Sequence, residues 1–377
     1  MRTLFACLTL ILLAPASLAQ NFDTAASHAV ILDFETGEVL FSKNGDEAMP
    51  PASMSKLMTT LMAFEALDNG TISLDTELPV SVYAWQTGGT TSGSSTMFLE
   101  PNTRVRVDDL LRGIIVQSGN DACIVLAEGL EGSEGAFADA MTARARELGL
   151  TSSTFANSTG WPDPEQRMSA IDLAHLAAII IRDHPDYYAI YDEREYTYNG
   201  IRQFNRNPLL GVFDGADGLK TGHTEESGYG LVASAERDGV RRIIVFNGMG
   251  SERERANEAE RMMRAAFSDF DVYPLFEAGA TVGDAEVFMG ESETVALRID
   301  DDAVVGLHRR DRRDMTVSII YDGPVSAPIA EGDPIGRLVV ETESGVAREF
   351  PLAAAESVAR KGMFGRAMDA LVGLLRG

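Results

Sequence analysis

The sequence contains little cysteine, with two residues in 377, Cys7 and Cys123. Cys7 falls in the apolar run 4–13, and small residues ending at Ala19 follow that run. This pattern is typical of a cleavable secretory signal over residues 1–19, with a mature chain that starts near residue 20. Once the signal is removed, Cys123 is the only cysteine left. An intramolecular disulfide is therefore excluded, and the mature protein must be stabilised by packing.

Histidine and positive charge are also scarce. The five histidines have no paired metal-binding spacing, so we expect neither a metal nor another cofactor. The chain has 32 Lys and Arg against 57 Asp and Glu, a formal charge of −25 that becomes −26 when Arg2 leaves with the signal. A charge of this sign argues against nucleic acid as a partner. The apolar run of the signal is too short for a stable membrane span.

Apolar residues are plentiful, at 45% of the chain, which is enough for two domains with real cores. Apolar runs on both sides of a turn at 35–37 predict a hairpin over 29–41, and two further strands are predicted at 229–235 and 241–247. Helical periodicity predicts helices at 54–67, 107–113, 122–129, 135–148, 170–183 and 254–267.

Two other regions have a distinct composition. Residues 86–96 form a polar stretch with three glycines, which predicts a mobile or functional loop. From residue 271 onward, short apolar stretches separated by glycines predict a second, β-rich domain. The acidic run 300–302 in this domain is most simply a solvated turn.

Three short motifs follow one another along the chain: Ser-Met-Ser-Lys at 53–56, Ser-Gly-Asn at 118–120 and Lys-Thr-Gly at 220–222. A serine followed three residues later by a lysine is expected on the order of once by chance in a chain of this length. The ordered set of three is far rarer. Such a set is known from serine acyltransferases.

The chemistry of the first motif is consistent with acyl transfer. A serine hydroxyl is a poor nucleophile until a base takes its proton, and Lys56 shares a helix face with Ser53. A lysine acts as a base only when burial or a second cation lowers its pKa, and Lys220 is a candidate for that cation. The two lysines could titrate as a coupled pair, so which of them is the base stays open.

Each motif also has an ordinary structural interpretation. Ser53 could be a helix N-cap beside a solvated lysine, residues 118–121 could be a turn that begins a helix, and 217–222 could enter a hairpin. Because all three motifs occur in the order known from serine acyltransferases, the three ordinary interpretations are disfavoured as a joint explanation. For Cys123, in contrast, the ordinary interpretation as a small buried side chain is preferred to a catalytic role.

Segments 51–59, 113–122 and 217–224 resemble the low-molecular-weight penicillin-binding proteins and, more narrowly, the D-alanyl-D-alanine carboxypeptidases. The resemblance covers nearly the whole mature chain. It implies an α/β (α+β) catalytic domain, with a mostly antiparallel sheet flanked by helices, then a small β-rich domain and an amphipathic tail helix. The expected boundaries are 1–19 for the signal, 20–270 for the catalytic domain, 271–353 for the β-rich domain and 354–377 for the tail.

The resemblance also implies an activity and its residues. The enzyme would remove the terminal D-alanine of a peptidoglycan pentapeptide through a Ser53 acyl-enzyme, and β-lactam antibiotics would acylate the same serine. Lys56 would take the serine proton and Ser118 would pass a proton to the leaving amine. Asn120 would bind the substrate's peptide carbonyl. Substrate binding is expected at the remaining family positions, namely Lys220, Thr221, Gly222, His223 and Arg255.

The resemblance also implies how four of these residues would act on the substrate. The oxyanion hole would consist of the backbone N–H groups of Ser53 and His223. The carboxylate binder Arg255 has a competitor two residues away, Arg253. Lys220 would supply positive potential.

Residues 358–376 form a basic amphipathic stretch on an acidic protein. A terminal helix docked on the protein's own surface would have the same pattern. The resemblance favours a peripheral anchor at a bilayer surface. Together with the signal, it implies a location in the cell envelope, on the outer face of the cytoplasmic membrane.

Three alternatives stay open. A DD-endopeptidase that cuts peptidoglycan crosslinks would use the same residues. A β-lactamase is disfavoured because the second motif is Ser-Gly-Asn, and because Glu165 lacks the neighbours that would position a deacylating water. We therefore expect a β-lactam to leave Ser53 slowly. A non-catalytic peptidoglycan-binding protein would have no need of Lys56.

Overall fold

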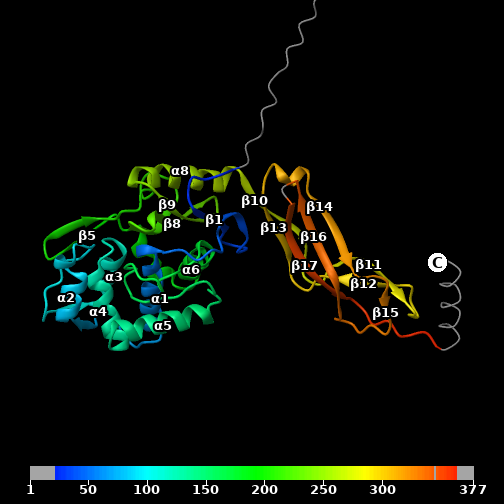
Figure 1. Cartoon of the computed structure of the whole chain (residues 1–377), viewed down its shortest axis with the longest axis horizontal. Helices are drawn as coiled ribbons and strands as arrows, with labels where there is room; N and C mark the ends of the chain where they lie inside the picture. Colours follow the sequence, from blue (N-terminus) through cyan, green and yellow to red (C-terminus); the bar gives the residue numbers. More distant parts are fainter. Residues whose placement is uncertain (1–21, 344, 363–377) are drawn as a thin grey trace, which may run out of the picture.

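The computed structural model describes residues 22–343 and 345–362. The predicted signal (1–19) and most of the predicted tail (363–377) lie outside the described residues. Figure 1 shows an α/β domain that ends with helix α8 (Glu252–Ser268), followed by a β-rich domain. This arrangement confirms the predicted fold class.

Within the described residues, five antiparallel strands form the sheet of the α/β domain, in the order β2-β1-β9-β8-β7. Side chains alternate between its two faces. In β9, Ile243 and Val245 join one hydrophobic core, whereas Ile244 and Phe246 join the other. The strands are β1 (His28–Asp33), β2 (Val39–Lys43), β7 (Ala216–Thr224), β8 (Gly228–Arg237) and β9 (Val240–Met249).

Helices cover both faces of this sheet. Helix α8 packs on one face through Met262 and Met263. The larger core on the other face surrounds α1 (Lys56–Asp68), which is apolar on almost every side and therefore lies in the domain interior. The other helices of this domain are α2 (Val82–Gly88), α3 (Val107–Ile115), α4 (Asn120–Glu131), α5 (Glu134–Glu147), α6 (Ala170–Asp183) and α7 (Pro185–Tyr188).

The predicted helices and the first hairpin are confirmed to within a few residues. The predicted loop 86–96 is only partly a loop, because α2 continues to Gly88 and a 3-10 turn follows at Thr90–Ser92. Gly88 packs so closely on α4 that a Cβ atom there would lie 2.4 Å from the backbone nitrogen of Asp121. Two short antiparallel pairs were not predicted: β3 (Glu77–Pro79) with β4 (Arg104–Arg106), and the hairpin of β5 (Glu195–Tyr198) and β6 (Ile201–Phe204).

The β-rich domain has its own hydrophobic core. Its described strands form a pair, β10-β13, and a sheet of order β14-β16-β17-β12-β11-β15. These strands are β10 (Phe270–Phe276), β11 (Thr281–Phe288), β12 (Thr294–Arg298), β13 (Ala303–His308), β14 (Thr316–Tyr321), β15 (Val325–Ser326), β16 (Pro334–Thr342) and β17 (Gly345–Ala354). Residues 300–302 form an exposed acidic turn, as predicted.

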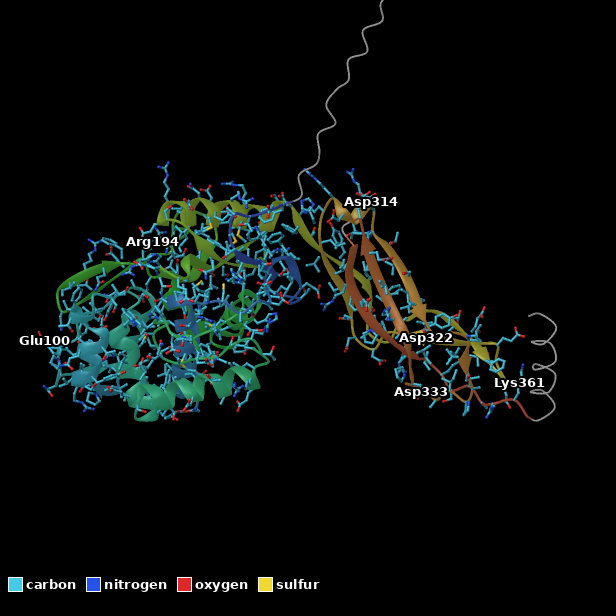
Figure 2. All side chains as sticks on the ribbon, in the orientation of Figure 1. Glu100, Arg194, Asp314, Asp322, Asp333 and Lys361 are labelled. Carbon is cyan, nitrogen blue, oxygen red and sulfur yellow. The ribbon has the colours of Figure 1, made fainter. Side chains whose placement is uncertain are left out.

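The predicted helix starting at residue 358 is wrong at its beginning. Val358 bridges to Ile329 and is buried in the core of the β-rich domain, with 4% of its surface exposed. An amphipathic tail can therefore begin only after residue 362. In Figure 2, Lys361 lies at the end of the β-rich domain that is remote from the α/β domain. Among the residues described, no helix combines the length and apolar character needed to cross a membrane.

A buried ion pair joins β1, β9 and α8. The Arg242 guanidinium donates to the Asp33 carboxylate, and both residues are about 95% buried, with 5% and 4% exposed. Arg242 Nε also donates to the carbonyl oxygen of Ala266 at the end of α8, at 3.2 Å. Asp33 in turn accepts from the Thr36 hydroxyl at 2.6 Å. Loss of one partner would leave an uncompensated charge in the interior.

We predict that Arg242→Ala lowers the free energy of unfolding of the α/β domain by about 3–5 kcal/mol. The exposed ion pair Arg264–Glu260 is the matched control. Arg264→Ala should change the free energy of unfolding by less than about 1 kcal/mol. Both tryptophans, Trp85 and Trp161, lie in this domain, so denaturant unfolding can be followed by their fluorescence. Equal effects of the two substitutions would contradict the prediction.

Candidate active site

Ser53 and Lys56 meet at the start of α1. Residues Ala52–Ser55 form a 3-10 turn that runs directly into the helix. Lys56 Nζ donates a hydrogen bond to Ser53 Oγ at 2.8 Å. The spacing of the first motif therefore brings the two side chains together as predicted.

Lys56 has no exposed surface, although it is a lysine. Its Nζ also donates to Asn120 Oδ1 at 2.8 Å and to the backbone carbonyl oxygen of Thr159. The pKa of Lys56 is lowered to about 8, chiefly by burial, and the positive charge of Arg206 acts in the same direction. Desolvation is thus the chief cause of the lowered pKa that the sequence required, and the nearby cation that acts on this amine is Arg206.

The second motif lies at the beginning of α4. Ser118 has a positive φ of 62°, and the chain turns there into the helix, whose N-terminus has no side-chain cap. Asn120 therefore points its amide into the site, where Oδ1 accepts from Lys56 and Nδ2 donates to Ser94 Oγ at 3.0 Å. The motif begins a helix, but its side chains are free for the site and do not cap it.

The fully buried carboxylate of Asp121 holds the preceding loop against α4. It accepts from the backbone nitrogen of Met97 at 2.9 Å, from that of Leu99 at 3.0 Å and from the Thr96 hydroxyl at 2.6 Å. The end of the polar stretch 86–96 is thereby fixed beside Asn120. No pattern in the sequence indicates this role of Asp121.

The third motif lies on β7, at the edge of the described sheet. Lys220 is buried, and its Nζ donates to the Thr221 carbonyl oxygen at 3.1 Å. Burial, followed by the charge of Lys56, lowers the pKa of Lys220 well below its ordinary value. At Gly222 a Cβ atom would lie 2.9 Å from the Pro51 carbonyl oxygen, so the glycine allows β7 to approach the turn that carries Ser53.

A cavity of about 800 Å³ opens over these residues. Lys56 and Lys220 are buried next to it, and the other predicted site residues line it: Ser53, Ser118, Asn120, Thr221, Gly222, His223 and Arg255. The three motifs and α8 therefore contribute to one site. Because β7 is an edge strand, the N–H groups on its unpaired side are available to a ligand.

Charged side chains of both signs line the cavity, namely the arginines Arg206 and Arg255 and the glutamates Glu225, Glu226 and Glu252. Arg255 is only 5% exposed, its Nε has no hydrogen-bond partner among the described residues, and its guanidinium lies 5.5 Å from the ring centre of Tyr229. Arg206, which sequence reasoning missed, also lines the cavity and donates to Ser95 Oγ at 2.7 Å. Because its Nε has no partner among the described residues, the Arg255 guanidinium can bind an anion, although the carboxylate of Glu252 lies nearby. Arg253, in contrast, is exposed.

Two other residues considered from the sequence do not take part in this arrangement. Cys123 has no exposed surface, and burial raises the pKa of its thiol to about 12, as expected for a packed side chain. Glu165 is exposed and does not line the cavity.

Both domains match known protein families. Residues 15–250 match the peptidase S11 family, D-alanyl-D-alanine carboxypeptidase. Residues 270–360 match the family of the penicillin-binding protein 5 C-terminal domain. The two matches together cover most of the chain.

Relatives and solved structures agree with these matches. The chain is 37% identical to the D-alanyl-D-alanine carboxypeptidase DacC of Escherichia coli over 343 residues, which are 90% of this chain and 86% of the relative. Penicillin-binding protein 5 of Haemophilus influenzae superposes with a TM-score of 0.71 at 33% identity, covering 90% of this chain and 99% of that one. Penicillin-binding protein D2 of Listeria monocytogenes, in its ampicillin-bound form, superposes with a TM-score of 0.57 at 32% identity, covering 66% of this chain and all of that one.

The buried lysine–serine pair, the three motifs around one cavity and the matches over both domains agree with one another. The chain belongs to the peptidase S11 family, and it is a penicillin-binding, serine-type D-alanyl-D-alanine carboxypeptidase.

Proposed function

We propose that Ser53 is the nucleophile of this carboxypeptidase and that Lys56 is its base. The observation that carries the proposal is the 2.8 Å hydrogen bond from Lys56 Nζ to Ser53 Oγ, made by an amine whose pKa burial lowers to about 8. Near neutral pH, part of the enzyme then has a neutral Lys56 that can accept the serine proton.

In the first step, Ser53 Oγ attacks the carbonyl carbon of the penultimate D-alanine, and Lys56 takes the proton. The backbone N–H groups of Ser53 and His223 stabilise the oxyanion. In comparable sites, loss of one such donor costs about 2.7–4 kcal/mol of barrier. The position of His223 on the edge strand β7 supports this role.

In the second step, the amide C–N bond breaks and terminal D-alanine leaves. Ser118, which lines the cavity, passes a proton to the departing amine. Asn120 donates its amide to the substrate's peptide carbonyl, in place of its present bond to Ser94. Lys220 keeps the site positive. Water then hydrolyses the ester and regenerates Ser53.

Arg255 and Thr221 bind the terminal carboxylate of the peptidoglycan pentapeptide. The buried guanidinium of Arg255 lines the same cavity as Ser53, and its Nε has no partner in the part of the chain that the structure describes, which supports this assignment over Arg253. Penicillins take the place of the peptide and acylate Ser53. Because Glu165 lies outside the cavity, we expect the penicilloyl ester to hydrolyse slowly.

We also propose that the enzyme is exported and attached to the outer face of the cytoplasmic membrane by a tail that follows residue 362. Lys361 lies at the end of the β-rich domain that is remote from the α/β domain, which supports this geometry. The β-rich domain would then hold the active site away from the bilayer, toward the peptidoglycan.

The first prediction concerns pH. Acylation needs neutral Lys56, whose pKa of about 8 lies below the ordinary 10.5. The second-order rate of acylation by benzylpenicillin should therefore fall about tenfold per pH unit below this pKa and level off above it. Stopped-flow or quenched mass spectrometry from pH 5.5 to 9.5 measures the profile. A flat profile over this range would exclude Lys56 as the base.

The second prediction concerns the carboxylate binder. Arg255→Glu should raise the KM for a peptide ending in D-Ala-D-Ala by about 10- to 100-fold, because a charged hydrogen bond is lost. Arg253→Glu is the matched control, since Arg253 is exposed on the same helix, and its KM should change less than about threefold. The assay is D-alanine release, and equal effects would discredit Arg255.

The third prediction concerns the tail. Deletion of residues 363–377 should release the enzyme from the membrane fraction to the soluble fraction and leave D-alanine release in solution unchanged. The deletion must spare Val358, because that side chain belongs to the core of the β-rich domain. If the shortened protein still sediments with membranes, the tail is not the anchor.

A further inference from the structure

The third acceptor of the Lys56 amine comes from an irregular loop. The carbonyl oxygen of Thr159 accepts from Lys56 Nζ, yet the loop 155–163 contains neither helix nor strand. The Asn157 side chain shapes this loop, since its Oδ1 accepts from the backbone nitrogens of Gly160 at 2.8 Å and Trp161 at 3.0 Å. These bonds lie within the loop, so they do not fix its distance from Lys56.

Glu134 attaches the loop to the helices. Its Oε1 accepts from the Ser158 hydroxyl at 2.7 Å and from the Ser158 backbone nitrogen at 3.2 Å. On its other side, the Ser158 carbonyl oxygen accepts from the Thr59 hydroxyl of α1 at 2.6 Å. Ser158 is therefore held between α5 and α1, one residue before the carbonyl that meets Lys56.

The carboxylate of Glu134 is itself well fixed. Glu134 is the first residue of α5 and is 9% exposed, and its Oε2 accepts from the Tyr83 hydroxyl of α2 at 3.0 Å. A helix N-terminus stabilises a negative charge. Glu134 thus connects α2 and α5 to the loop without touching the cavity.

We propose that Glu134 is a positioning residue for the reaction: by holding Ser158, it places the Thr159 carbonyl oxygen so that Lys56 is directed at Ser53. This inference rests on the proposed role of Lys56 as base. Without the carboxylate, both donors of Ser158 lose their acceptor, the Thr159 carbonyl moves, and the Lys56 amine loses one of its three fixed partners.

Glu134 also acts on Lys56 through its charge. The charged and titratable groups that act on Lys56 are Asp121 and Cys123 from α4, Arg206, and Glu134 from α5, while Lys56 itself acts on Lys220 of β7. The carboxylate oxygens of Asp121 are occupied by the loop 96–99. Removal of the negative charge at Glu134 should shift the acidic limb of the acylation profile to lower pH, because the charge favours the ammonium form.

The test separates position from charge with two variants. Glu134→Ala removes both, and it should lower the plateau rate of Ser53 acylation by benzylpenicillin on the order of 10- to 100-fold, as misplacement of a catalytic group does. Glu134→Gln keeps acceptors for Ser158 and removes the charge. It should restore the plateau to within about threefold of wild type, with the acidic limb moved to lower pH. Tyr83→Phe, which removes only the bond to Oε2, is the control and should stay within about twofold.

Acylation is measured by intact-protein mass from pH 5.5 to 9.5, on variants whose far-UV circular dichroism matches wild type; tryptophan fluorescence is not used, because Trp161 lies in the loop itself. A folded Glu134→Ala variant with the wild-type profile would overturn the proposal, as would a Glu134→Gln variant that is as slow as Glu134→Ala. If Glu134→Ala does not fold, the same measurement is made on Ser158→Ala, which removes the hydroxyl that donates to Glu134. A several-fold slower plateau supports the positioning role, and an unchanged plateau rejects it.

The proposed function is tested separately in the same experiment by Ser53→Ala. An adduct that persists in Ser53→Ala would reject Ser53 as the nucleophile and, with it, the basis of the inference. An adduct confined to Ser53, together with Glu134 variants that behave as wild type, would reject only the role of Glu134.

Discussion

Burial of one amine is the constraint on which the site depends. Lys56 lies in the interior at the start of α1, where the ammonium form is disfavoured because it loses its water. The same burial requires hydrogen-bond acceptors for the amine, and these come from the Ser53 hydroxyl, the Asn120 amide and the Thr159 carbonyl. The three acceptors belong to three different parts of the chain. Burial thus lowers the pKa of Lys56. It also requires three separate parts of the chain to meet at this amine, so the active site forms only in the folded protein.

The fold provides this arrangement through its central helix and its edge strand. Helix α1 is apolar on nearly all sides, so it runs through the larger core and holds Lys56 at its inner end. Strand β7 approaches the same end closely because Gly222 has no side chain. The cavity forms where these elements meet α4, and its walls combine polar groups with the guanidinium of Arg255.

Much of this site could be predicted from the sequence, because local geometry decides it. The three-residue spacing of Ser53 and Lys56 predicts that they meet, and the 2.8 Å hydrogen bond confirms it. The longer helices, the first hairpin and the strands β8 and β9 followed from periodicity, whereas β7 was not predicted. The requirement that burial or a second cation lower the pKa of Lys56 followed from chemistry alone, and burial is the chief cause in the structure.

The residues that could not be predicted act over long range or sit in irregular loops. Thr159 contributes a backbone carbonyl and lies 103 residues from Lys56 in the sequence. Every residue has such a carbonyl, so the contact cannot be predicted from the type of side chain. Asp121, Glu134 and Arg206 are ordinary charged residues in the sequence. Their roles arise from hydrogen bonds to loops that pack against them only in the folded chain. The start of the tail was misplaced for a related reason, since the apolar spacing that includes Val358 fits a helix, whereas that side chain fills a β core.

The most direct test of the account is the mass of the intact protein after reaction with benzylpenicillin, for wild type beside Ser53→Ala, with D-alanine release from a D-Ala-D-Ala peptide measured on the same samples. If Ser53 is the nucleophile, wild type forms a long-lived penicilloyl adduct and releases D-alanine, and Ser53→Ala does neither. An adduct that survives in Ser53→Ala, or wild type that forms none, would contradict this assignment.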